Sequence, residues 1–91
     1  MRARVSLGRK PYVTDGFRKV SLWPSEATLL WALMARPRLT VDEAIPLIWP
    51  APDREPDWPE AGVRVRMCRL RKNLAEMGIS IKTHQRGWAL A

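Results

Sequence analysis

The stretch from residue 63 to residue 77, VRVRMCRLRKNLAEM, constrains the fold more than any other part of the chain. At about 100° per residue, its apolar side chains fall within about 80° of arc on one side of a helix. These side chains are Val63, Met67, Leu70, Leu74 and Met77. The stretch is therefore predicted to be one amphipathic helix whose apolar stripe faces a core.

The other sides of this predicted helix are strongly basic. Five of residues 63–72 are Arg or Lys, and none is an acid that could pair with them at i+4 spacing. Arg64 and Arg71 lie on one flank, Arg66 and Asn73 on the other, and the side opposite the stripe carries Val65, Cys68, Arg69, Lys72 and Glu76. Such a surface is either a solvated basic face or a recognition surface for nucleic acid.

The charge of the whole chain favours nucleic acid. The net charge is +7 and the pI is about 10.8, which indicate an anionic partner. Residues 1–20 hold six Lys or Arg and one acid, residues 21–60 hold three and seven, and residues 61–91 hold seven and one. If the two ends lie together, they form one basic surface with an acidic back. An anionic membrane surface is the weaker interpretation, since no amphipathic terminal helix is evident.

The length of 91 residues predicts a single domain covering residues 1–91. No apolar run is long enough for a membrane span or a signal peptide, so we expect a soluble, cytoplasmic protein without membrane contact. The single Cys excludes an internal disulfide, and one Cys with one His excludes a zinc site. No cofactor is expected.

The first 22 residues are predicted to form a small antiparallel sheet. Strands at residues 12–14 and 17–22 flank the hairpin signal Asp15-Gly16, and residues 4–7 form an earlier strand. A first helix follows at residues 24–36, with Pro24 in its first turn. Its buried residues are expected to be Leu29, Leu30, Leu33 and Met34. Trp31 lies off that stripe and is expected to pack on the sheet rather than be exposed.

The middle of the chain predicts a second, short helix. Thr40 and Glu43 form a capping box, and Pro46 should shorten the helix so that it ends at Trp49-Pro50. Residues 50–59 contain four prolines and should form a stiff loop pinned by Trp58. Gly78 suits the end of the basic helix, and a hairpin follows. The predicted parts are thus a sheet at 1–22, three helices at 23–77 and a hairpin at 78–91.

A helix-turn-helix followed by a hairpin is a winged helix, and the chain resembles the DNA-binding effector domains of OmpR/PhoB-type bacterial response regulators. The resemblance covers about 75 residues. It rests on DGFRKVSL, WPSE, IW, VRVRMCRLRKNL and IKTHQRGWAL, against family patterns such as V-x-V-x-I-x-x-L-R-K-x-L and I-x-T-x-R-G-x-G-Y-x-L. It implies an α+β winged helix-turn-helix with an N-terminal antiparallel sheet, three helices and a C-terminal β-hairpin wing.

Three departures from the family pattern bear on function. Trp23 replaces the family's capping Thr, so the first helix lacks its usual side-chain cap. The wing is one residue shorter, which leaves open whether Gln85 or Arg86 points at DNA. We expect the module to stand alone, without a receiver domain before it, as a regulator of bacterial or phage origin without phosphorylation control.

The resemblance implies a division of roles on double-stranded DNA. The helix enters the major groove, where the side chains expected at base edges are Arg64, Val65, Arg69 and Lys72. The side chains expected at phosphates or, for the wing, in the minor groove are Arg66, Arg71, Lys82, Thr83 and Arg86. Trp49 stands where the family contacts phosphate with a Trp, and a role as a core anchor fits it equally well. Because one module usually reads a half-site, binding as a homodimer or in tandem is expected.

Protein docking, enzymatic activity and RNA binding are the alternatives to DNA binding. A winged helix can instead dock on RNA polymerase or another regulator, with Trp58 in the proline-rich loop, and Trp31, as protein contacts. The resembling family touches polymerase with the corresponding loop, so both interpretations can hold. An enzyme is disfavoured, because His84 has no catalytic partner implied by spacing and no phosphate-binding glycine loop exists. RNA is disfavoured because a sheet with interleaved aromatic residues is missing.

Overall fold

The computed structural model describes residues 3–91, and its elements follow the predicted order. The strands β1 (Arg4–Ser6), β2 (Tyr12–Thr14) and β3 (Lys19–Ser21) precede helix α1 (Pro24–Ala35). Then come β4 (Leu39–Thr40), α2 (Val41–Ile48), the 3-10 turn η1 (Pro52–Arg54) and α3 (Pro59–Ala75). The chain closes with β5 (Ile81–His84) and β6 (Gly87–Leu90). The predicted α+β class is confirmed.

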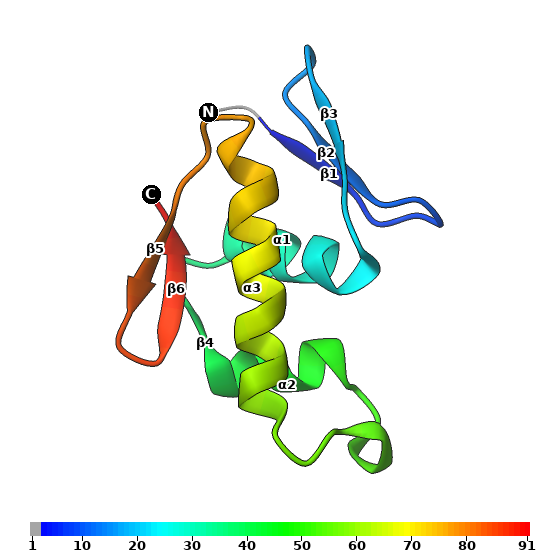
Figure 1. Cartoon of the computed structure of the whole chain (residues 1–91), viewed down its shortest axis with the longest axis vertical. Coiled ribbons are helices and arrows are strands. Elements are labelled where there is room, and N and C mark those ends of the chain that lie inside the picture. The colour runs from blue at the N-terminus through cyan, green and yellow to red at the C-terminus, as the bar shows by residue number, and fades with distance from the viewer. Residues whose placement is uncertain (1–2) are drawn as a thin grey trace.

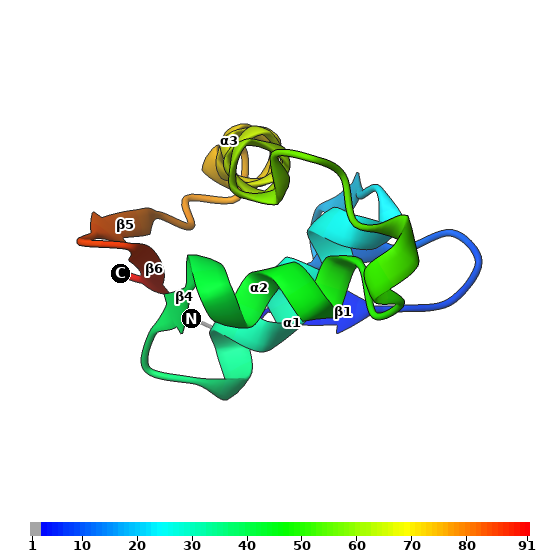
Figure 2. The ribbon, with the colours of Figure 1, turned by 90° about the horizontal axis from the view of Figure 1, so that it is seen from below.

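Two small antiparallel sheets flank the helices. The first has the order β1-β2-β3 and the second the order β4-β6-β5. In Figure 1 the first sheet lies at the upper right and the second at the left, with α3 running down the front between them. Seen from below in Figure 2, α3 lies on one side of the molecule and α1 and α2 on the other.

One apolar core joins these elements. It contains the stripe of α3 and, from α1, Ala27, Leu29, Leu30, Ala32 and Leu33. The predicted burial of Leu29, Leu30 and Leu33 is confirmed, whereas that of Met34 is wrong, because its side chain is 42% exposed. Leu29, Leu30 and Leu33 already fill the side of α1 that faces the core.

Local signals at the helix ends behave as expected. In the capping box of α2, the Glu43 N–H donates to Thr40 Oγ1 at 3.1 Å, and the Thr40 N–H donates to Glu43 Oε1 at 3.0 Å. The Thr40 N–H and the Thr40 hydroxyl both donate to Glu43 Oε1, and these two bonds hold the pKa of Glu43 below its ordinary value. Helix α3 ends at Ala75, two residues before the predicted Met77, and Gly78 follows at φ 70° in the predicted left-handed conformation. Trp23 provides no side-chain cap for α1, also as predicted.

Several boundaries differ from the prediction. The loop at residues 50–59 contains η1, and α3 begins at Pro59 rather than at Val63, because proline suits the first position of a helix. Strand β3 begins at Lys19 and not at residue 17, since Thr14 pairs with Lys19 and leaves a four-residue turn. Strand β4 was not predicted, because two residues give no periodic signal.

Candidate nucleic-acid interface

The two predicted sides of α3 are present in the structure. Val63, Leu70 and Leu74 are fully buried, Met67 is 1% exposed and Met77 is 8% exposed, so the apolar stripe is confirmed. The side chains predicted to meet base edges are all exposed, and they are Arg64, Val65, Arg69 and Lys72. Val65 is apolar but 52% exposed, so it forgoes the free energy that burial of its side chain would contribute to folding. Helix α3 therefore offers one free face.

The backbone of the wing is attached to β4 and to the start of α2. Its turn places Arg86 at φ 62°, a left-handed conformation that is costly for a residue with a Cβ. The Arg86 carbonyl accepts the Val41 N–H at 2.9 Å, which attaches the turn to the start of α2. A Cβ at Gly87 would lie 2.5 Å from the Leu39 carbonyl oxygen, so β4 can approach only because residue 87 is glycine. The turn is thus fixed while the Arg86 side chain stays exposed.

One side-chain bond links the wing directly to α3. Arg71 Nη2 donates to Thr83 Oγ1 at 2.7 Å, and both residues are exposed. Lys82, next to Thr83 on β5, is also exposed. The structure therefore brings the predicted residues of helix and wing onto adjoining surfaces.

Two of the predicted site residues already have partners within the chain. Arg66 and Trp49 are half-buried, and the Arg66 guanidinium carbon lies 5.0 Å from the centroid of the Trp49 ring. Arg66 also donates to Ser25 Oγ at 3.2 Å and to the Gly62 carbonyl at 3.0 Å. Trp49 packs against the core. Both side chains hold elements together.

The two tryptophans assigned to protein contact are not packed as expected. Trp58, predicted to pin the loop, is 65% exposed, and Trp31, expected to pack on the first sheet, is 50% exposed. Prolines stiffen the loop by restricting its own backbone, so it keeps its shape without burying Trp58. Phe17 at the β2–β3 turn is 96% exposed.

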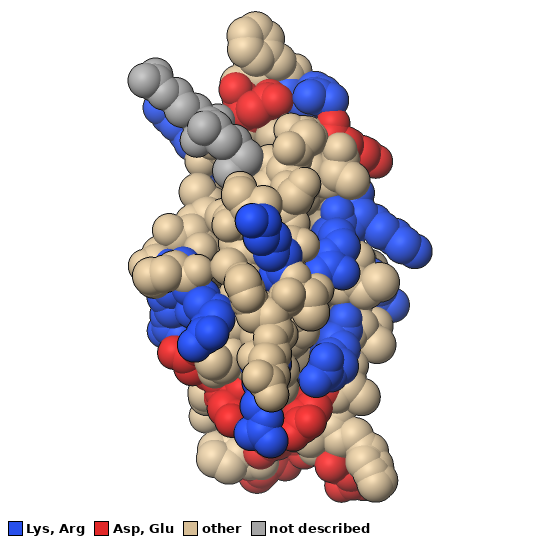
Figure 3. Space-filling view, turned by 90° about the vertical axis from the view of Figure 1, so that its left-hand side faces the viewer, with Lys and Arg blue, Asp and Glu red and all other residues tan. Residues whose placement is uncertain are grey.

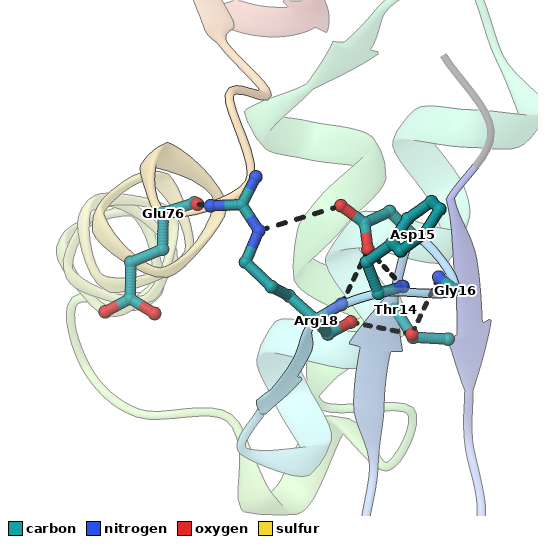
Figure 4. Close-up of polar contacts among 6 residues, drawn as sticks. Thr14, Asp15, Gly16, Arg18 and Glu76 are labelled. Carbon is teal, nitrogen blue, oxygen red and sulfur yellow. Dashed lines mark hydrogen bonds and ion pairs between the residues drawn. The ribbon is translucent and has the colours of Figure 1, made fainter.

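The β2–β3 turn carries polar contacts that the sequence did not indicate (Figure 4). Asp15 Oδ1 accepts the N–H groups of Arg18 and Phe17, each at 2.8 Å, and these bonds hold the pKa of Asp15 below its ordinary value. Thr14 Oγ1 donates to the Arg18 carbonyl at 2.7 Å. Arg18 also donates to the Glu76 carbonyl, which ties this sheet to the end of α3. The first sheet thereby supports α3.

Glu26, in the first turn of α1, has a role that the sequence did not indicate, because its side chain is only 1% exposed. Its Oε1 accepts the Trp23 N–H at 3.1 Å and Asn73 Nδ2 at 3.2 Å. Within residues 3–91 its Oε2 has no hydrogen-bond partner. A buried carboxylate therefore joins α1 to α3.

The charge distribution distinguishes the candidate surface from the rest of the molecule. Figure 3, which views the side of the wing, shows Lys and Arg gathered across the middle and acidic groups mainly towards the lower end. The two ion pairs found in residues 3–91 join Arg18 to Asp15 and Arg36 to Glu43. Neither pair uses a basic residue of α3 or of the wing, although Asp42 and Glu60 line the same hollow as Arg64 and Arg86.

Residues 3–91 contain no group of three or more His, Cys, Asp or Glu that could hold a metal ion. Within the same residues, no helix is both long and apolar enough to cross a membrane.

Together, the three helices, the helix-turn-helix arrangement and the C-terminal hairpin define a winged helix-turn-helix domain. Among solved structures, the chain is similar to the C-terminal domain of the nisin resistance regulator NsrR, a lantibiotic response regulator. The TM-score is 0.71 at 24% identity, over 94% of this chain and 90% of that domain. The predicted winged helix-turn-helix fold, with an N-terminal sheet and a C-terminal hairpin, is therefore confirmed. No protein-family model matches the chain, and no curated protein matches it significantly.

Proposed function

We propose that this chain is a sequence-specific, double-stranded DNA-binding transcriptional regulator of bacterial or phage origin. Helix α3 enters the major groove, and the wing contacts the adjacent backbone or minor groove. Arg64, Val65, Arg69 and Lys72 meet base edges. Arg71, Lys82, Thr83 and Arg86 meet the backbone or, from the wing, the minor groove.

The observation that carries this proposal is the outward face of α3. Its basic residues are exposed and take part in no ion pair within residues 3–91, although a typical surface helix pairs many of its charges. A guanidinium can bridge O6 and N7 of guanine, and an exposed valine can meet a thymine methyl. A helix of 17 residues with this face suits the groove.

Selection of bound sequences from a random duplex pool, followed by titration over a salt series, tests the proposal. We expect one recovered motif and affinity that falls steeply with salt. If about four phosphates are neutralised per module, log K should fall against log salt with a slope of about −3.5. No enriched motif, together with a slope near zero, would reject DNA binding.

A second candidate function is docking on RNA polymerase or on another regulator. The observation that favours it is Trp58, which is 65% exposed beside the acidic residues Asp57 and Glu60. Large exposed aromatic residues are typical of protein interfaces. Trp58 lines the same hollow as Arg64, so the two candidate surfaces adjoin at the start of α3. Binding of purified polymerase that is lost in Trp58→Ala, with DNA affinity unchanged, would establish it.

A single module of this size usually reads a half-site. We therefore propose that two copies bind together, as a homodimer or in tandem. The expected result is a recovered motif with two half-sites about one helical turn apart. Inverted half-sites would indicate a symmetric homodimer, and directly repeated half-sites would indicate tandem binding.

A further inference from the structure

Arg66 connects three elements from the flank of α3 that faces α1. Its Nε donates to Ser25 Oγ at 3.2 Å in the first turn of α1, and its Nη1 donates to the Gly62 carbonyl at 3.0 Å in its own helix. Its guanidinium lies over the ring of Trp49, the residue that ends α2. Each contact uses a different part of the planar group, so a displaced guanidinium loses several contacts together.

Asn73 makes a second link on the same flank. Seven residues separate Asn73 from Arg66, so the two side chains project within about 20° of each other around the helix axis. Asn73 Nδ2 donates to Glu26 Oε1 at 3.2 Å, and that oxygen also accepts the Trp23 N–H at 3.1 Å. Helix α3 is thus tied to the first turn of α1 at two levels about two turns apart.

Two links at different levels on one flank restrict rotation of α3 about its own axis. The apolar stripe alone does this less well, because aliphatic contacts are not directional. With a radius of about 5–6 Å including side chains, a roll of about 10° moves an outward side chain by about 1 Å. Arg69 lines the same hollow as Ser25, Trp49 and Arg66, and it would move with the helix.

We propose that Arg66, assisted by Asn73, is a positioning residue that sets the rotation of α3 and so controls discrimination between DNA sequences. This inference rests on the proposed function, and it replaces the phosphate contact that the sequence suggested for Arg66. Two of the three nitrogens of the Arg66 guanidinium already donate within the chain and the group lies over Trp49, which favours the positioning role. Loss of the link should impair base contacts, which need placement within about 0.5 Å.

The positioning role and the phosphate-binding role of Arg66 predict different effects of the Arg66→Lys substitution. A lysine keeps the charge but has neither the planar group for Trp49 nor the fork of donors. If Arg66 positions α3, Arg66→Lys and Arg66→Ala should both reduce the ratio of affinities for the selected site and a scrambled duplex by about tenfold. The salt slope should stay at its wild-type value in both variants.

If Arg66 instead contacts phosphate, the results reverse. Arg66→Lys would then behave as the wild type, and Arg66→Ala would lower the slope by about one with the affinity ratio unchanged. Lys82→Ala, on the exposed wing, is the matched control for that second pattern. Asn73→Leu removes the other link at similar volume and should reproduce the loss of discrimination at unchanged slope. An unchanged ratio in Asn73→Leu would overturn the role of Asn73.

A measurement without DNA separates this inference from the proposed function. Residual dipolar couplings of backbone amides in the free protein report the orientation of α3 relative to α1. We expect Arg66→Lys to rotate α3 while thermal melting stays cooperative, and Lys82→Ala to leave the orientation unchanged. An unrotated helix in Arg66→Lys would overturn the inference. Failure of the wild type to bind any duplex would reject the proposed function alone.

Discussion

The flank of α3 towards α1 and its outward face both carry polar and basic residues, but the partners of these residues differ. On the flank towards α1, Arg66 and Asn73 bond to Ser25 and Glu26. On the outward face, Arg69 and Lys72 are exposed and form no ion pair within residues 3–91. The composition of a basic helix therefore does not identify its binding residues. The internal partners of each side chain distinguish the arginines that organise the fold from those left for a ligand.

The largest effect on stability should come from a substitution in the buried stripe of α3 rather than on its outward face. Leu70→Ala empties a fully buried site and should lower the free energy of unfolding by about 2–5 kcal/mol. Val65→Ala, on the outward face of the same helix, should change it by about 0.5 kcal/mol or less. Denaturant unfolding of both variants measures this. Equal losses would mean that the faces of α3 are misassigned.

Arg86→Gly should separate the structural role of the wing turn from its role in DNA binding. The Arg86 backbone holds the turn in place, whereas the Arg86 side chain is exposed. Glycine relieves the φ of 62°, an advantage of about 1 kcal/mol that is partly offset by its greater freedom in the unfolded chain. Unfolding stability should therefore stay within about 1 kcal/mol of the wild type. Duplex affinity should fall uniformly across sequences, with a slope smaller by about one. A marked loss of stability would instead assign the side chain an internal role.

The smallest effect concerns the β2–β3 turn, which supports α3 from the other end. The folded pKa of Asp15 is lowered chiefly by the bonds from Arg18 and Phe17 N–H groups. A group with a lowered folded pKa stabilises the fold above its unfolded pKa and loses that effect as pH falls through the folded value. Below about pH 4 the melting temperature of the wild type should therefore fall more than that of Asp15→Asn. Parallel pH profiles would show that the turn contributes nothing.

The order of elements could be predicted because it depends on local patterns. The stripe from Val63 to Met77 follows from helical spacing, and the start of α2 follows from Thr40 and Glu43. The β2–β3 turn was predicted with the wrong length, since Asp15 extends it by accepting two N–H groups. Strand β4 pairs only because Gly87 admits the Leu39 backbone, and such proximity has no signal in sequence spacing.

The candidate site was predictable in part for the same reason. Helical spacing indicates which side chains of α3 point outward, and the resemblance indicates which hairpin residues lie nearby. Neither indicates which residues a side chain on the flank towards α1 contacts. The partners of Arg66, namely Ser25 and Trp49, come from elements 41 and 17 positions earlier in the chain. Contacts at that separation depend on tertiary packing, and Glu26 was missed on the same ground.

The central claim is that the outward face of α3 reads sequence while the wing reads the backbone. The most direct measurement compares the affinities of Arg69→Ala and Arg86→Ala for the selected site and for a scrambled duplex, at several salt concentrations. Arg69→Ala should lose about 1–3 kcal/mol on the selected site and relax preference at one base pair. Arg86→Ala should weaken binding to both duplexes by similar factors and lower the slope by about one. If Arg86→Ala abolishes discrimination and Arg69→Ala leaves it untouched, the wing is the reader and the account is contradicted.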